Sequence, residues 1–553
     1  MRQYLSTNKY KVWYTICFLL LGVIDQRRGS AVGEVQMFFA NLTGVVMALM
    51  VLPSLNGRIL KDKVYRYWTP VCLILSIVAC GSGKKAWGYK QPWVAGVLSV
   101  AMWSYLVIYI IREWNGLSVR SRIRKPFFWC VLVMLVLMQI SAHGGILPLW
   151  YMLIFGGFYL IGISEEKRVF FWDGMLNGII IWFFIQQTMA FAFRPYDYVR
   201  YKGLYAGETQ NGLFYMIVYC AFLIKWIWEK EKKGKRWITG FYFLFAAVSI
   251  SFMVFTGGRS AILGMAVATL VLITVYDIIQ KKSFYRWFFH GVALVLCMVI
   301  TFPIVYCGIR YLPTVLHHPI WYEGEYREGG SICSFDTWDS PKYISFEEAI
   351  DNNVGRILDA VGIDYHKLLE RLQSSISGMK VYAAELSEGT ELGIAEPEII
   401  EPGSTPQNPF MLEGIDIDSA FGARKVIYTY YWNHLNWRGH QNTEQGFYIT
   451  EFAYISHAHN AFMQMAYDYG IPVGVLYIVI CVYSLVCTFR MRRPEQWICM
   501  MFLISILCFG LTEMVVVPGQ ITVPLVAIIF CFVGEKGSLK DSNREGALQA
   551  ENK

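Results

Sequence analysis

Apolar runs long enough to cross a membrane recur along this chain, and they constrain its fold more than any other feature. A helix of about 20 apolar residues spans the hydrocarbon core of a bilayer. Hydrophobic residues make up 55% of the chain and charged residues only 16%, a balance typical of integral membrane proteins. The sequence therefore predicts an all-α polytopic membrane helix bundle of about 12–14 transmembrane helices. The candidate runs are 12–24, 34–53, 67–82, 92–111, 126–141, 146–163, 169–193, 212–228, 237–256, 260–278, 287–308, 471–489, 496–511 and 516–534.

Lys and Arg gather in alternate connections between these runs. Loops that stay in the cytoplasm are enriched in these two residues. With the N-terminus inside, the basic connections 58–66, 120–125, 230–236, 281–286 and 490–493 all fall on the cytoplasmic side. We therefore expect a multi-pass protein of the cell membrane with both termini cytoplasmic. The same pattern accounts for the net charge of +8, so no nucleic-acid partner is expected.

One long polar stretch interrupts the apolar runs and divides the chain. It is acidic through its middle, and we expect it to be a large, partly helical extracytoplasmic loop. Within it, apolar residues recur at helical spacing over 346–373 and again over 420–441. The predicted parts are membrane helices over 1–308, the loop over 309–458, three further membrane helices over 459–534 and a cytoplasmic tail over 535–553.

Two segments at the extracytoplasmic helix ends carry unusual cations. Ionisable residues near membrane depth are costly and usually functional. The loop "RPYDYVRYKGLYAGETQNG" contains Arg200 and Lys202, although basic residues are not expected on this side. In "FTGGRSAILGM", Arg259 follows two glycines and Ser260 is expected to cap the helix that starts there. Such a helix start with a guanidinium would bind a pyrophosphate; the alternative is an arginine that only snorkels to the interface.

A third segment, "SHAHNAFMQMAYDYGIPVG", places two histidines before an apolar helix. The imidazole of His459, beside Asn460, can act as a general base near neutral pH. His457 would diverge from it on a helix, so we assign it a supporting role. The alternative is an interfacial histidine that anchors a helix end. A metal cluster of His434, His440, His457 and His459 matches no strong ligand spacing, so neither a metal nor another cofactor is expected.

Together these segments resemble the superfamily of O-antigen ligases and of O-antigen and capsular polysaccharide polymerases. The His-Asn pair followed by Gly470 and Gly474 is similar to the family's His-Asn motif, although the glycine pair is one residue wider than usual. "TGGRSAILGM" resembles the family's Ser/Thr-x-x-Arg segment. The loop with Arg200, Gly203 and Asn211 resembles the family's loop with the spacing Arg-x-x-Gly-x-x-x-x-x-x-Asn. "GARKVIYTYY", through Arg424, resembles the Arg-containing helix late in the family's large loop.

The resemblance implies an inverting, metal-independent membrane glycosyltransferase at the outer face of the cytoplasmic membrane. Its donor and acceptor would be undecaprenyl-diphosphate-linked oligosaccharides, with the lipid bilayer and a chain-length regulator as further partners. His459 would be the base and Arg259 the catalytic cation. The substrate-binding residues would be Arg200, Lys202, Asn211, Arg424, Arg438, His457 and Asn460. We expect a polysaccharide polymerase; transfer to a terminal acceptor, as in a ligase, is the alternative.

Two other classes of protein remain open. A flippase for lipid-linked oligosaccharides would have a similar number of spans, but it would need neither the large loop nor the His-Asn helix start. A metal-dependent glycosyltransferase would require outward-facing acidic ligands, for which Asp416 and Asp418 are the candidates. Activity that survives a chelator would exclude the second class.

Overall fold

The structure is a computed structural model in which part of the chain is described. Each candidate run of the sequence overlaps one helix. The acidic loop segment from 356 to 421, with Asp416 and Asp418, lies outside the described residues. The described residues are 2–28, 33–57, 61–81, 92–115, 117, 119–194, 196, 200–205, 207–280, 284–316, 346–355, 422–441, 446–448, 454–490, 495–517 and 519–536.

Within the described residues, eight helices are long and apolar enough to cross a membrane. They are α2 (Gly33–Val51), α4 (Pro92–Arg112), α8 (Glu165–Phe193), α9 (Glu208–Glu231), α10 (Arg236–Phe255), α11 (Arg259–Gln280), α12 (Phe284–Val315) and α18 (Ile471–Arg490). Four shorter apolar helices accompany them: α6 (Pro126–Ile140), α7 (Ile146–Ile161), α19 (Glu495–Gly510) and α20 (Thr522–Lys536). The chain is therefore a multi-pass, all-α membrane protein.

The remaining helices are α1 (Arg2–Arg28), α3 (Lys63–Gly81), α5 (Val119–Ile123), α13 (Phe346–Ile350), α16 (Gly422–Asn433) and α17 (Ala461–Tyr469), with the short helices η1 (Leu52–Ser54) and η4 (Asp351–Gly355). The helix predicted over 346–373 is thus described only at its start, and the one predicted over 420–441 ends at Asn433.

Helix α9 lies at the centre of the bundle, and the apolar stretch with which it could cross the membrane is entirely buried. Elsewhere small residues let helices approach closely, as is common between membrane helices. A Cβ at Gly174 of α8 would lie 2.6 Å from the Cβ of Tyr14 on α1. One at Gly264 of α11 would lie 2.8 Å from the carbonyl oxygen of Ser505 on α19. This contact fixes α11 against α19, whose ends carry the residues of the candidate site.

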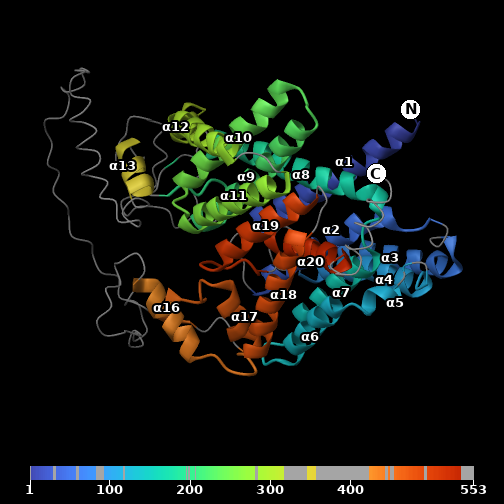
Figure 1. Cartoon of the computed structure of the whole chain (residues 1–553). Helices are drawn as coiled ribbons and strands as arrows, with labels where there is room; N and C mark the ends of the chain where they lie inside the picture. The colour runs from blue at the N-terminus through green and yellow to red at the C-terminus, as the bar shows by residue number, and fades with distance from the viewer. Residues whose placement is uncertain are drawn as a thin grey trace, which may run out of the picture.

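A second, smaller core lies at one end of the bundle. It joins α16, α17 and the antiparallel pair β1 (Phe447–Tyr448) and β2 (Tyr454–Ile455). Figure 1 shows α16 and α17 side by side in orange, away from the start of α1. Its buried members are Val426, Ile427, Tyr431, Phe447, Ala458 and Tyr467.

Helix α17 is separate from the membrane helix that follows it. Gly470 ends α17 with φ of 101°, and α18 begins at the next residue. A Cβ at Gly474 would lie 2.5 Å from the Cβ of Ala466, so the two helices meet where only hydrogen fits. The His-Asn pair therefore precedes a separate nine-residue helix. It does not open the membrane helix itself, as the sequence had suggested.

Candidate functional site

Glu513 follows α19 and pairs with two of the predicted site residues. One carboxylate oxygen lies 3.2 Å from His459 Nδ1, and the other lies 2.9 Å from Arg424 Nη2. The side chain of Glu513 is only 13% exposed. A carboxylate can only accept hydrogen bonds, so the proton of a neutral His459 is held on Nδ1 and the lone pair is left on Nε2. This arrangement suits a general base whose reactive nitrogen is Nε2.

The backbone of His459 is in the left-handed region, with φ of 48°. This conformation costs a residue other than glycine about 1–3 kcal/mol and is found most often at functional sites. The hydroxyl of Tyr428 on α16 lies 3.3 Å from the carbonyl oxygen of His459. It lies equally close to the carbonyl oxygen of Leu511. The surroundings thus hold His459 in a conformation that presents its imidazole to Glu513.

Asn460 is the N-cap of α17 and also joins that helix to the end of α19. Its side-chain oxygen accepts hydrogen bonds from the backbone N–H groups of Phe462 and Met463, each at 3.0 Å. Its amide nitrogen donates to the carbonyl oxygen of Leu511 at 2.8 Å. A cap of this kind stabilises a helix by about 1 kcal/mol. Asn460 therefore has a structural role at the site that is complete without a ligand.

His457 lies against His459, with ring centroids 4.1 Å apart. Burial and, to a lesser degree, the neighbouring His459 lower the pKa of His457 to about 4, although Glu513 opposes the shift. Since a left-handed residue precedes α17, the two imidazoles converge; the helical geometry assumed from the sequence would have made them diverge. His457 is uncharged at neutral pH and can accept or donate a hydrogen bond beside the base.

The segment that carries Glu513 also contacts the Arg259 turn. The hydroxyl of Thr512 donates to the hydroxyl of Ser260 at 2.6 Å. Helix α11 begins at Arg259, and the carbonyl oxygen of Gly258 accepts from two backbone N–H groups of its first turn. Ser260 is thus inside the helix. It is not the N-cap that the sequence predicted. Arg259 is exposed at this end of the bundle, one residue away from the Ser260–Thr512 contact.

Arg200 reaches the same turn from the loop between α8 and α9. Its Nη2 donates to the carbonyl oxygen of Gly257 at 2.8 Å, and its Nη1 lies 3.5 Å from a carboxylate oxygen of Glu208. The turn and the start of α9 meet through glycines, because a Cβ at Gly258 would lie 3.6 Å from the Cα of Gly212. The loop that carries Arg200, the turn before Arg259 and the start of α9 are therefore in contact with one another.

Three further residues were predicted to bind substrate, namely Asn211, Lys202 and Arg438. Asn211 is fully buried and donates to the carbonyl oxygen of Tyr201 at 3.2 Å, which closes the Arg200 loop on the start of α9. Lys202 is half-buried in that loop. Arg438 is exposed, and its carbonyl oxygen accepts from the backbone N–H of Ala142, between α6 and α7. Asn211 thus shapes the loop, and Arg438 lies on the side of the site that faces α6.

The other two histidines of the hypothetical metal cluster pack on aromatic rings. His440 stacks on Tyr467 with centroids 3.9 Å apart, and His434 lies 4.2 Å from Tyr430. In the described part of the chain, no group of three or more His, Cys, Asp or Glu side chains is placed to hold a metal ion. These two histidines thus have packing roles in the small core around α16 and α17.

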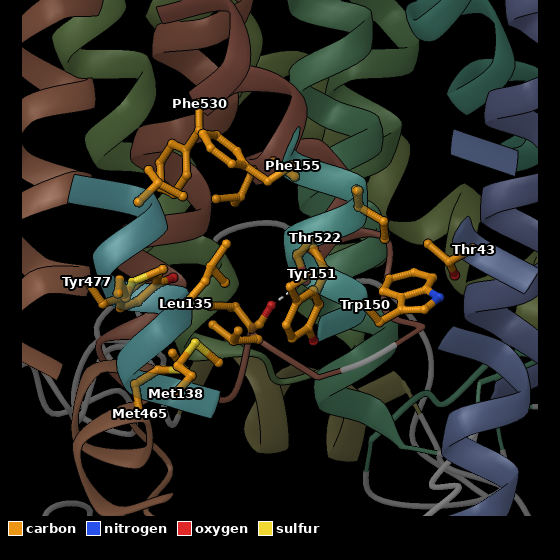
Figure 2. A pocket seen from close by; sticks show the side chains of 18 of the residues that line it. Thr43, Leu135, Met138, Trp150, Tyr151, Phe155, Met465, Tyr477, Thr522 and Phe530 are labelled. Atoms are coloured by element: carbon orange, nitrogen blue, oxygen red, sulfur yellow. Dashed lines mark hydrogen bonds between the residues drawn. The ribbon is translucent and has the colours of Figure 1, made fainter. Parts of the chain in front are cut away.

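An apolar cavity of about 100 Å³ lies beside the site, among α2, α6, α7, α18 and α20 (Figure 2). Val515 and Val516 line it, and they follow Glu513 by two and three residues. Met465 of α17 lines it as well. Its walls are almost wholly hydrocarbon, so the cavity itself has no acid–base chemistry. The polar site and an apolar space therefore adjoin along the segment after α19.

Glu513 is the site residue that sequence reasoning missed. It stands in "CFGLTEMVVVPG", as the one charged residue of an apolar stretch at a helix end. An ionisable residue in that position is a functional candidate in its own right, and this signal could have identified it. The pairing with Arg424, 89 residues earlier, and with His459, 54 residues earlier, is not visible in the sequence.

Comparison with known proteins gave no match to a family model, a curated protein or a solved structure.

Proposed function

We propose that this chain is a membrane glycosyltransferase that joins lipid-diphosphate-linked repeat units into a polysaccharide. The observation that carries the proposal is the convergence of separate candidate segments on residues 511–513. Thr512 contacts the Arg259 turn, which Arg200 also contacts, and Glu513 contacts both Arg424 and His459. A base and several guanidinium groups in one place are what transfer from a diphosphate requires.

In the proposed reaction, Nε2 of His459 takes the proton of the acceptor hydroxyl. The hydroxyl oxygen then forms a bond to the anomeric carbon of the donor, on the face opposite the leaving group. The bond from that carbon to the diphosphate oxygen breaks, and the lipid diphosphate leaves with the electron pair. Arg259 stabilises the charge that develops there, and Arg200 holds the preceding turn through the carbonyl oxygen of Gly257. The carboxylate of Glu513 stabilises the imidazolium that forms on His459.

Arg424 has a different role in this proposal from the one the resemblance implies. Its guanidinium is paired with Glu513, so we assign it to holding that carboxylate in place. A buried carboxylate needs such a partner, because an unpaired charge at low exposure is costly. Arg259 then supplies the charge for the substrate, and Arg200, itself 3.5 Å from a carboxylate oxygen of Glu208, holds the turn before Arg259.

Deletion and complementation in the source cells test the proposal. Cells without the chain should accumulate single lipid-linked units on the extracytoplasmic side, and the wild-type gene should restore polymer. His459→Ala and Arg259→Ala should each abolish polymer although the protein is expressed and inserted normally. Wild-type polymer from the His459→Ala variant would exclude the proposed base, and units trapped in the cytoplasmic leaflet would favour a flippase instead.

A further inference from the structure

A chain of hydrogen bonds runs from Asp468 to the backbone immediately before His459. The Nε2 of Gln464 donates to Asp468 Oδ1 at 2.6 Å, and the Oε1 of Gln464 accepts from the backbone N–H of Ala458 at 2.7 Å. Gln464 is 4% exposed and Ala458 is fully buried. No part of the mechanism above uses Gln464 or Asp468.

The carboxylate of Asp468 determines which way round the amide of Gln464 lies. An ionised carboxylate only accepts, so the NH₂ group of Gln464 must face it. The amide oxygen then faces Ala458 and holds its N–H. Asp468 is itself held in place, since its carbonyl oxygen accepts from the backbone N–H of His440 at 3.1 Å.

The consequence falls on His459, whose φ of 48° is in the left-handed region. Gln464 holds Ala458, the residue before His459, and Tyr428 contacts the carbonyl oxygen of His459. Asn460, the residue after His459, donates to the carbonyl oxygen of Leu511. If the first contact were lost, the backbone would be free to relax to an ordinary φ and to carry the imidazole away from Glu513.

We propose that Gln464 and Asp468 are positioning residues that hold the His459 base against Glu513. The inference rests on the proposed function, because it gives His459 the role of base. The two residues act through the backbone of Ala458 and do not contact the reacting groups.

Exchanging the two functional groups provides the test. Gln464→Glu alone places two carboxylates where a 2.6 Å hydrogen bond stood. Gln464→Glu combined with Asp468→Asn keeps the same net charge and restores both hydrogen bonds: the amide at position 468 then donates to the carboxylate at position 464, which still accepts from the backbone N–H of Ala458. Gln441→Glu is the matched control, because it makes the same exchange at an exposed residue. Burial raises the pKa of Asp468 to about 7, so the assays are run at pH 8.

Two measurements are made on each full-length variant in proteoliposomes. The first is kcat and KM for polymer formation from lipid-linked repeat units extracted from cells that lack this chain. The second, independent of activity, is hydrogen exchange of the peptide that contains residues 454–460. Gln464→Glu should lower kcat at least tenfold with KM within twofold and should speed exchange of this peptide. Gln441→Glu and the double variant should stay within threefold of wild type in kcat, with wild-type exchange.

The inference is overturned if Gln464→Glu has wild-type kcat and exchange, or if a folded double variant is no better than the single one. The double variant decides the matter even where Gln464→Glu does not fold. If the wild-type protein makes no polymer while exchange follows the predicted order, the proposed function fails and the positioning of residue 459 stands.

Discussion

At the scale of single residues, Glu513 connects the parts of the proposed site. It accepts from His459 and from Arg424 and is mostly buried. The guanidinium of Arg424 and the carboxylate of Glu513 form an ion pair beside the imidazole of His459. This arrangement makes the negative charge of Glu513, and not only its shape, the quantity to test.

Glu513→Gln should lower kcat for polymer formation by about 100-fold, because a neutral amide cannot stabilise the imidazolium of His459. The measurement is the initial rate with lipid-linked units in proteoliposomes. Glu165→Gln is the control, since Glu165 is 74% exposed and its ion pair with Arg168 is 3.6 Å long. A Glu513→Gln variant as active as this control would remove Glu513 from the mechanism.

The lowered pKa of His457 predicts a pH dependence of stability. The folded protein keeps His457 neutral down to about pH 4, whereas the unfolded chain takes up a proton near pH 6.5. Between these values the unfolded state binds more protons, so this residue makes the fold less stable as the pH falls. In His457→Gln, the drop in melting temperature between pH 7.5 and pH 5 should be smaller than in wild type. An equal or larger drop would contradict the prediction. Asp468, whose pKa is raised, contributes with opposite sign in both proteins.

The sequence predicts that His459 and Asn460 precede an apolar helix, and in the structure they stand immediately before α17, with Asn460 as its N-cap. Sequence reasoning could not foresee the left-handed backbone of His459, which depends on Tyr428, Gln464 and Leu511 from three separate segments. Ser260 was predicted to cap α11. Its contact with Thr512 depends on tertiary packing, which the sequence does not show.

At the scale of elements, two glycines determine how α17 meets its neighbours. A Cβ at Gly470 would lie 2.4 Å from the carbonyl oxygen of Trp437, and its φ of 101° disfavours other residues. Gly474 allows α18 to touch Ala466 of α17. The wider spacing of this glycine pair thus has a structural explanation. Gly470 allows the end of α17 to approach Trp437, and Gly474 allows α18 to approach Ala466.

Gly470→Ala and Gly474→Ala should each destabilise the protein by about 1–3 kcal/mol, because backbone must shift to admit the methyl group. Gly240→Ala in α10 is the control, since a Cβ at Gly240 would meet no neighbouring atom within 4 Å. The measurement is thermal unfolding in detergent. Melting temperatures of both variants equal to that of the control would show that α17 can move away from its neighbours without cost.

At the scale of the whole molecule, the run length of apolar residues predicts the architecture well. Every predicted run overlaps a helix, and eight helices of the described chain meet the criteria for a membrane span. The predicted run 471–489 matches α18 closely, whereas a separate helix over 461–469 was not predicted. Gly470 marks the boundary, but a glycine alone does not distinguish a break from a close helix contact.

The charge distribution predicts that the loop over 309–458 is extracytoplasmic. Alkaline phosphatase, which needs disulfides formed outside the cytoplasm, should be active when fused after residue 330 and inactive when fused after residue 235. The opposite pattern would place the candidate site in the cytoplasm and exclude the proposed substrate side.

The most direct test of the account uses the purified chain in proteoliposomes with extracted lipid-linked repeat units. Gel analysis follows polymer length, and the released lipid diphosphate is measured in the same reaction. The account predicts a ladder of products and one lipid diphosphate released per bond formed, both lost in His459→Ala and in Arg259→Ala. Undiminished ladders and undiminished lipid diphosphate release from both variants would contradict it.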